Sequence, residues 1–172
     1  MTSASGGIYV IMGVAGSGKT RIGTAFARAL GVAFVEGDDH HPAANLALMS
    51  RGIPLTDADR AGWLAELARC IREASEAHKG LVLTCSALKR SYRDLLRAAG
   101  APNEVTFVFL RGPRTLIAER RATRSGHFMP ASLLDSQLAT LEEPAPDEGA
   151  WVCDISDTPN DLVAALVARA SA

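Results

Sequence analysis

The sequence lacks most of the features that mark a secreted, zinc-binding or membrane protein. Its three cysteines, Cys70, Cys85 and Cys153, are scattered and form no C-x-x-C pair. This pattern indicates a reduced chain rather than a disulfide framework or a zinc site. The polar N-terminus MTSASGG has no basic segment before an apolar core, so no signal peptide is predicted. No run approaches the roughly 18 apolar residues of a spanning helix, and we expect a cytoplasmic protein.

The chain also lacks a strong charge of either sign. Its formal net charge is −1, so neither a broad nucleic-acid surface nor a patch for an acidic membrane is expected. A length of 172 residues favours one domain, and an apolar fraction of 48% is ample for a core. The histidines lack metal-ligand spacing such as H-E-x-x-H, and zinc is not expected. They are His40, His41, His78 and His127.

Strand and helix patterns alternate along the chain. Short apolar segments predict strands at residues 8–12, 32–35, 81–85, 105–110 and 151–155. Apolar residues at helical spacing predict helices up to about residue 30 and at 89–99, 113–124, 131–141 and 160–169. Another helix opens at Thr56-Asp57-Ala58-Asp59, which resembles a capping box with Asp in place of Glu. This alternation implies an α/β fold with a parallel sheet covered by helices on both faces.

The segment GVAGSGKT follows the first predicted strand and fits G-x-x-x-x-G-K-[ST]. Its glycines let successive backbone N–H groups face phosphate oxygens, and the helix that follows adds its positive dipole end. Lys19 is predicted to reach the β- and γ-phosphates, and the Thr20 hydroxyl to coordinate magnesium. The sequence therefore predicts a nucleotide-binding loop. Its residues are Gly13, Val14, Ala15, Gly16, Ser17, Gly18, Lys19 and Thr20.

Two absences narrow the class of P-loop protein. The chain has no N-K-x-D segment, with which a GTPase reads its base, and no acid ends the strand at 81–85. Small-molecule kinases often place a carboxylate after the second strand instead, where Asp38 and Asp39 stand. A carboxylate near the γ-phosphate can accept the proton of an attacking hydroxyl. The alternative is a solvated turn, which Gly37 also favours.

Basic residues gather in two places beyond the glycine loop. Lys89 and Arg93 lie one helical turn apart after the third strand and are candidates to bind an anionic substrate. The alternative is an ordinary helix surface. Arg120 and Arg124 share a helix face, where like charges are unfavourable unless an anion lies between them. A nucleotide triphosphate is one explanation and the helix C-terminal dipole is the other, while Gly126 is a candidate hinge for a lid.

Four segments together resemble a known family. GVAGSGKT, EGDDHHPAANLALMSRGIPLTDADRAGWL, CSALKRSYRDLLR, and ERRATRSGHFM with LLDSQLATLEEP are similar to small P-loop gluconate kinases, relatives of shikimate and adenylate kinases. They run from residue 8 to about 144. The resemblance implies a three-layer P-loop NTPase fold and transfer of the γ-phosphate of ATP to the 6-hydroxyl of D-gluconate. It also implies magnesium, a mobile lid and a homodimer.

The resemblance implies roles for particular residues within a single domain of residues 1–172. Lys19 and Asp38 would be catalytic, and Arg120 and Arg124 would belong to the nucleotide side of a lid at about residues 120–142. A helical insertion at about residues 40–78 would bind the substrate. Combined with the candidates above, the predicted substrate-binding residues are Asp38, His41, Arg60, Lys89, Arg93 and His127.

Three positions depart from the family pattern. Gly62 stands where the family usually has Pro before Trp, Leu48 stands where Lys is frequent, and Ala15 replaces a frequent Ser. The first two put the affinity for substrate in question, since Gly loosens the first turn of a helix and a positive charge is lost. Two other functions remain open: another P-loop small-molecule kinase, acting on shikimate, a nucleoside monophosphate or another sugar acid, and a non-catalytic nucleotide-binding regulator.

Overall fold

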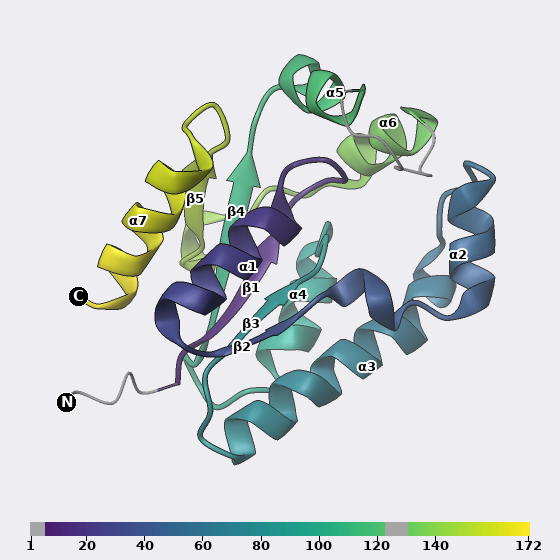
Figure 1. The fold of residues 1–172 in the computed structure, drawn as a ribbon. Coiled ribbons are helices and arrows are strands. Elements are labelled where there is room, and N and C mark those ends of the chain that lie inside the picture. The colour runs from purple at the N-terminus through teal and green to yellow at the C-terminus, as the bar shows by residue number, and fades with distance from the viewer. Residues whose placement is uncertain (1–5, 123–130) are drawn as a thin grey trace.

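The computed structural model describes residues 6–122 and 131–172, and in these residues five parallel strands form one sheet (Figure 1). The strands are β1 (Ile8–Met12), β2 (Ala33–Val35), β3 (Leu81–Thr84), β4 (Val105–Arg111) and β5 (Trp151–Asp154). Their order in the sheet is β2-β3-β1-β4-β5, and every neighbouring pair is parallel. The prediction of a parallel α/β sheet is confirmed.

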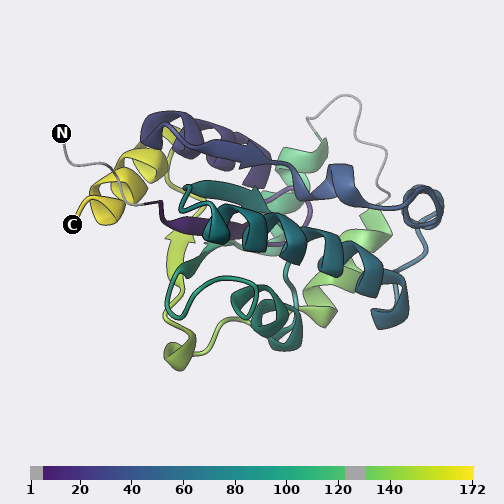
Figure 2. The same cartoon turned by 90° about the horizontal axis from the view of Figure 1, so that it is seen from below.

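Helices cover both faces of this sheet. The helices are α1 (Lys19–Leu30), α2 (Ala43–Ser50), α3 (Asp57–Glu76), α4 (Arg90–Arg97), α5 (Arg114–Ala122), α6 (Ala131–Thr140) and α7 (Pro159–Ala170). Two short 3₁₀ turns, η1 (Gly37–His40) and η2 (Pro146–Glu148), were not predicted. Figure 2 shows α1 and α7 on one side of the sheet and α3 and α4 on the other.

The core consists of two apolar layers, one on each face of the sheet. The central strand β1 contributes to both, because Val10 faces the layer under α3 and α4 while Ile11 faces the layer under α1 and α7. A strand buried on both faces requires the unbroken apolar run that the sequence has at residues 8–12. A third, smaller cluster of Met49, Leu55 and Leu133 joins the α2 region to α6 away from the main core.

Local signals account for where several helices begin and end. Gly31 takes a left-handed φ of 69° and ends α1 at Leu30, where the predicted helix also ends. At the start of α3, the Thr56 hydroxyl accepts from the Asp59 N–H at 3.1 Å while Asp59 Oδ2 accepts from the Thr56 N–H at 2.9 Å. This confirms the predicted capping box. Helix α4 is shorter than the predicted 89–99, and the end of the predicted helix at 113–124 lies outside the described residues.

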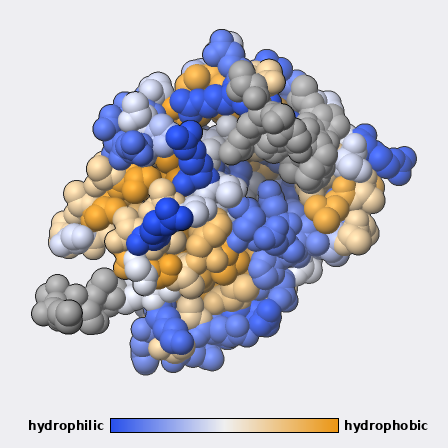
Figure 3. Space-filling view, viewed as in Figure 1, coloured by the Kyte–Doolittle hydropathy of each residue, from blue (hydrophilic) through white to orange (hydrophobic). Residues whose placement is uncertain are grey.

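The surface in Figure 3 carries apolar side chains around the edge strand β2, below α1. They adjoin a groove whose walls include Val32, Val35 and Cys70. Among the described helices, none combines the length and the apolar character that crossing a membrane would need.

Candidate active site

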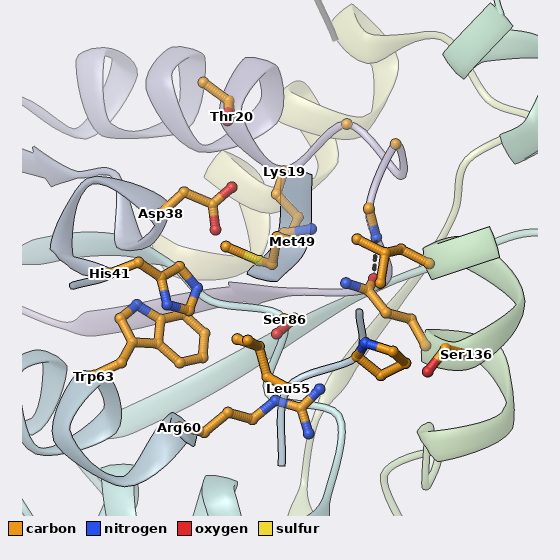
Figure 4. A pocket seen from close by; sticks show the side chains of 16 residues that line it. Lys19, Thr20, Asp38, His41, Met49, Leu55, Arg60, Trp63, Ser86 and Ser136 are labelled. Carbon is orange, nitrogen blue, oxygen red and sulfur yellow. Dashed lines mark hydrogen bonds between the residues drawn. The ribbon is translucent and has the colours of Figure 1, made fainter. Parts of the chain in front are cut away.

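A pocket lies at the carboxyl ends of β1, β2 and β3, where ligands bind in open α/β folds (Figure 4). Segments far apart in the sequence form its walls, including the glycine loop, η1, the start of α3 and helix α6. The lining residues are Ala15, Gly16, Gly18, Lys19, Thr20, Asp38, His41, Met49, Pro54, Leu55, Arg60, Trp63, Ser86, Leu133, Ser136 and Gln137.

The glycine loop has the backbone geometry of an anion cradle. Gly13, Gly16 and Gly18 have φ values of 151°, 84° and 99°, which side-chain-bearing residues rarely adopt. Gly18 directly precedes α1, so the N–H groups of that helix open toward the pocket. The Lys19 ammonium donates to the carbonyls of Gly13 and Val14, each at 3.0 Å, and so lies across the loop.

The remaining loop residues differ in what they present. The side chains of Val14 and Ser17 are buried and absent from the pocket wall, so only their backbone is available to a ligand. The Ala15 N–H already donates to Oε1 of Gln137, on α6, at 2.6 Å. Sequence reasoning missed Gln137, because the two residues are 122 positions apart.

Two of the carboxylates just after β2, Asp38 and Glu36, face different partners. Asp38 lines the pocket on the same side as Lys19 (Figure 4). Glu36, which sequence reasoning missed, accepts from the Thr20 hydroxyl at 2.5 Å and from the Thr84 hydroxyl at 2.7 Å. Thr84 ends β3, where many ATPases have an acid. Glu36 therefore places a carboxylate beside the end of β3, where the sequence itself has no acidic residue.

An aromatic wall closes the pocket on the side of α3. The Trp63 indole N–H donates to the Gly37 carbonyl at 2.8 Å, and the His41 ring stacks on the indole with centroids 4.0 Å apart. The Asn45 amide nitrogen lies 3.3 Å from His41 Nδ1. Because the Asn45 amide nitrogen can only donate, His41 Nδ1 is assigned as the acceptor and His41 Nε2 carries the proton. Burial, with a smaller effect from Arg60, lowers the pKa of His41 to about 4.

The predicted basic residues are placed very differently. Arg60 is only 9% exposed and lines the pocket, where its Nη1 donates to the Tyr92 hydroxyl at 3.0 Å. Lys89 lines an adjoining cleft instead, and its ammonium donates to Asp57. Leu48, at a position where the family frequently has Lys, packs against the apolar cluster of Met49, Leu55 and Leu133.

The prediction that Arg93 contacts the substrate is wrong. Its side chain is 0% exposed, and its guanidinium donates to both carboxylate oxygens of Glu148, at 2.7 and 3.0 Å. It also donates to the Ala87 carbonyl at 2.8 Å. A buried arginine with these partners fastens α4 to η2 and has no surface left for a ligand.

The predicted lid residues are only partly described. Arg124, Gly126 and His127 lie outside the described residues, while Arg120 and Arg121 lie in the last turn of α5. A Cβ built on Gly16 would meet Arg121 Cγ at 2.3 Å, so the stem of Arg121 lies directly over the glycine loop. Sequence reasoning chose Arg120 for its i, i+4 spacing to Arg124 and passed over Arg121.

The parallel sheet, the glycine loop and the helix that follows it define a P-loop fold protein, and the pocket joins that loop to a polar acceptor region. Residues 8–144 match a family described as an AAA domain. The structure resembles that of a shikimate kinase from Bacteroides thetaiotaomicron with a TM-score of 0.64, at 18% identity over 96% of this chain and 98% of the other. At that identity the likeness shows the fold alone.

Closer relatives narrow the class. The chain is 56% identical to the gluconokinase of Gluconobacter oxydans over 139 residues, which cover 81% of this chain and 77% of the relative. It is 45% identical to the thermosensitive gluconokinase of Escherichia coli, with coverage of 84% and 76%. The structure of a gluconokinase from Sinorhizobium meliloti matches with a TM-score of 0.87 at 46% identity, over 97% and 92% of the two chains. The chain belongs to the gluconokinase family of P-loop kinases.

Proposed function

We propose that this protein transfers the γ-phosphate of ATP to the 6-hydroxyl of D-gluconate, giving 6-phospho-D-gluconate and ADP. One observation carries the proposal: the glycine loop, Asp38 and Arg60 line the same pocket in a chain that belongs to the gluconokinase family. Lys19 and Asp38 are the proposed catalytic residues. The loop residues 13–20 with Arg120 and Arg124 would bind ATP, and Asp38, His41, Arg60 and His127 would surround the acceptor.

The nucleotide half acts by fixed positive charge. The backbone N–H groups of the loop and the start of α1 hold the phosphates, and Lys19 stabilises the negative charge that grows on the γ-phosphate oxygens during transfer. Arg121, whose stem covers Gly16, is a further cation for this half. Helix α6 and its Gln137 contact with the loop would belong to the lid at about residues 120–142.

Magnesium fits the residues present. Among the described residues no three His, Cys, Asp or Glu side chains gather to hold a metal, and Mg²⁺ usually needs only one or two protein groups beside phosphate oxygens. Thr20 would be the protein ligand, since its hydroxyl hydrogen points to Glu36 and its lone pairs are left for a cation. When bound, the ion neutralises charge on the β- and γ-phosphates.

The acceptor half acts by orientation. Asp38 would accept the proton of the 6-hydroxyl and hold its oxygen in line with the γ-phosphate. His41, neutral and with Nε2 protonated, would donate to a hydroxyl of the sugar acid. This half corresponds to the proposed insertion at residues 40–78. A cytoplasmic homodimer of single-domain chains is the assembly that we propose.

The test is ADP release from purified protein with MgATP and each of D-gluconate, shikimate, AMP and glucose. Saturable turnover with D-gluconate alone is expected. Turnover with shikimate or AMP instead would assign the protein to another class of P-loop kinase. Tight ATP binding with no turnover on any acceptor would contradict the proposed reaction and favour a nucleotide-binding regulator.

A further inference from the structure

Four side chains from α3 and the start of α4 form a chain of contacts that ends on Arg60. The Lys89 ammonium donates to the two carboxylate oxygens of Asp57 at 3.0 and 3.3 Å. The Tyr92 hydroxyl donates to Asp57 Oδ1, and Arg60 Nη1 donates to that hydroxyl at 3.0 Å. Only Arg60, the last member, lines the main pocket.

The donor and the acceptor of each hydrogen bond between these four side chains can be assigned. A tyrosine hydroxyl has one hydrogen, and Tyr92 gives it to Asp57, so a lone pair remains for the guanidinium. The hydrogen bonds from Tyr92 and then Lys89 lower the pKa of the Asp57 carboxyl, which is therefore ionised and can only accept. Lys89 balances the charge of Asp57, so that carboxylate does not neutralise Arg60.

Arg60 keeps an unmatched charge in a confined place. Its side chain is 9% exposed, and over residues 6–122 and 131–172 its one hydrogen-bond acceptor is the Tyr92 hydroxyl. In the same residues no carboxylate oxygen lies within 4.0 Å of its nitrogens. A largely buried guanidinium is stable when an anion meets its remaining N–H groups. The pocket is the direction from which such an anion can come.

The position of Arg60 suits one end of the acceptor. Figure 4 shows its guanidinium across the pocket from Lys19 and Thr20, with Ser86 between them, while Asp38 lies on the Lys19 side. In D-gluconate the carboxylate and the 6-hydroxyl are at opposite ends of a six-carbon chain. A substrate with its hydroxyl at Asp38 would therefore direct its carboxylate toward Arg60.

We propose that Arg60 binds the carboxylate of the sugar acid and that Tyr92 and Asp57 are positioning residues that aim its guanidinium. The inference rests on the proposed function and adds to it a basis for selecting acids over uncharged polyols. Lys89 acts through Asp57 rather than on the substrate. A hydroxyl between Arg60 and Asp57 orients the guanidinium without cancelling its charge, which a direct ion pair would do.

The test is Tyr92→Phe, which removes the hydroxyl and keeps the ring that lies beside Arg60 and Lys89. The KM for D-gluconate should rise by at least about tenfold, the loss expected for one hydrogen bond to a charged group. The kcat and the KM for MgATP should stay within about twofold of the wild type. D-Glucitol, which has no carboxylate, should be phosphorylated with an unchanged kcat/KM.

Tyr9→Phe is the matched control, since Tyr9 is the other tyrosine of the chain and its ring packs against Phe26 and Trp151, away from the pocket. It should leave all these constants unchanged. Asp57→Asn should raise the KM for D-gluconate as well. The KM of the double variant with Tyr92→Phe should be no higher than that of the more affected single variant, because both changes break the same series of hydrogen bonds to Arg60.

An unchanged KM for D-gluconate in Tyr92→Phe would overturn the inference. An equal loss with D-glucitol, or an equal rise in the KM for MgATP, would also overturn it, because the hydroxyl would then serve general packing. Calorimetric binding of D-gluconate separates this outcome from failure of the proposed function. A wild type that binds D-gluconate without transferring phosphate contradicts the proposed reaction. The ratio of the Kd values of wild type and Tyr92→Phe still tests whether Tyr92 positions Arg60 for the carboxylate.

Discussion

The two halves of the pocket are built in different ways. The phosphate half is built around eight consecutive residues, 13–20, with arginines of the predicted lid added, and most of its proposed contacts are backbone N–H groups. The proposed acceptor half is made of side chains that the fold brings together from η1, the residue after it and α3, such as Asp38, His41, Arg60 and Trp63. A backbone cradle can serve any nucleotide, whereas side chains determine which acceptor is held. The shikimate kinase described above shares the fold at 18% identity, and a shared fold does not by itself determine the acceptor.

The largest effect is expected in the phosphate half. Lys19→Ala should lower kcat by at least about a thousandfold, because it removes the only side-chain charge of the loop from the transferring phosphate. The fold should be retained, since the two hydrogen bonds described above join the Lys19 ammonium to carbonyls of its own loop rather than to another element. Steady-state kinetics and circular dichroism check this, with Lys79→Ala, exposed beside β3, as the matched control. A kcat near that of the control would contradict the role of Lys19.

The second largest effect is expected in the acceptor half, at Asp38. Asp38→Asn should lower kcat by about a hundredfold, because the amide cannot take the hydroxyl proton. The KM for D-gluconate should change by less than about threefold, since an amide can still accept a hydrogen bond from the hydroxyl. Asp39→Asn is the control, because Asp39 is the adjacent exposed carboxylate and is absent from the pocket wall. Equal losses in the two variants would show that Asp38 has no special part in catalysis.

A smaller effect is expected when the hydrogen bond between Thr20 and Glu36 is changed. Glu36→Gln should raise the magnesium concentration for half-maximal rate about tenfold, a typical cost of losing a group that orients a metal ligand. The reason is that Glu36 takes the hydrogen of the Thr20 hydroxyl and leaves its lone pairs for the ion. The rate at saturating magnesium should recover most of its value. Glu73→Gln, on the exposed side of α3, is the control, and identical magnesium curves would contradict the assignment.

The same division separates what the sequence could predict from what it could not. The glycine loop before α1, the capping box before α3 and the end of α1 near residue 30 are local signals, and the structure has each at the predicted place. Strand order and the pairing of β4 with β5 follow from packing of the whole chain, which a single sequence does not display.

Errors in the acceptor half have the same cause. Lys89 and Arg93 were grouped because they are one helical turn apart, but Arg93 is buried against Glu148, 55 residues further along. Glu36 was passed over because its partner Thr84 is 48 residues away. Helical spacing shows which residues share one face of a helix. It does not show which distant segment of the chain packs against that face, and the role of a residue such as Arg93 depends on that segment.

The last prediction is the absence of an effect, and it tests whether His41 acts in the acceptor half as a neutral group beside the charged Arg60. Burial and the nearby Arg60 charge both disfavour the imidazolium, so the pKa of His41 falls to about 4 and the ring stays neutral between pH 5 and 8. The NMR signal of the His41 ring, assigned by its loss in His41→Asn, should therefore not shift over that range, whereas free histidine in the same buffer will. A ring that gains charge between pH 6 and 7 would put a second cation beside Arg60. The proposed hydrogen bond from a neutral His41 to a hydroxyl of the sugar acid would then be a charged contact, and the acceptor half would differ less from the phosphate half than we propose.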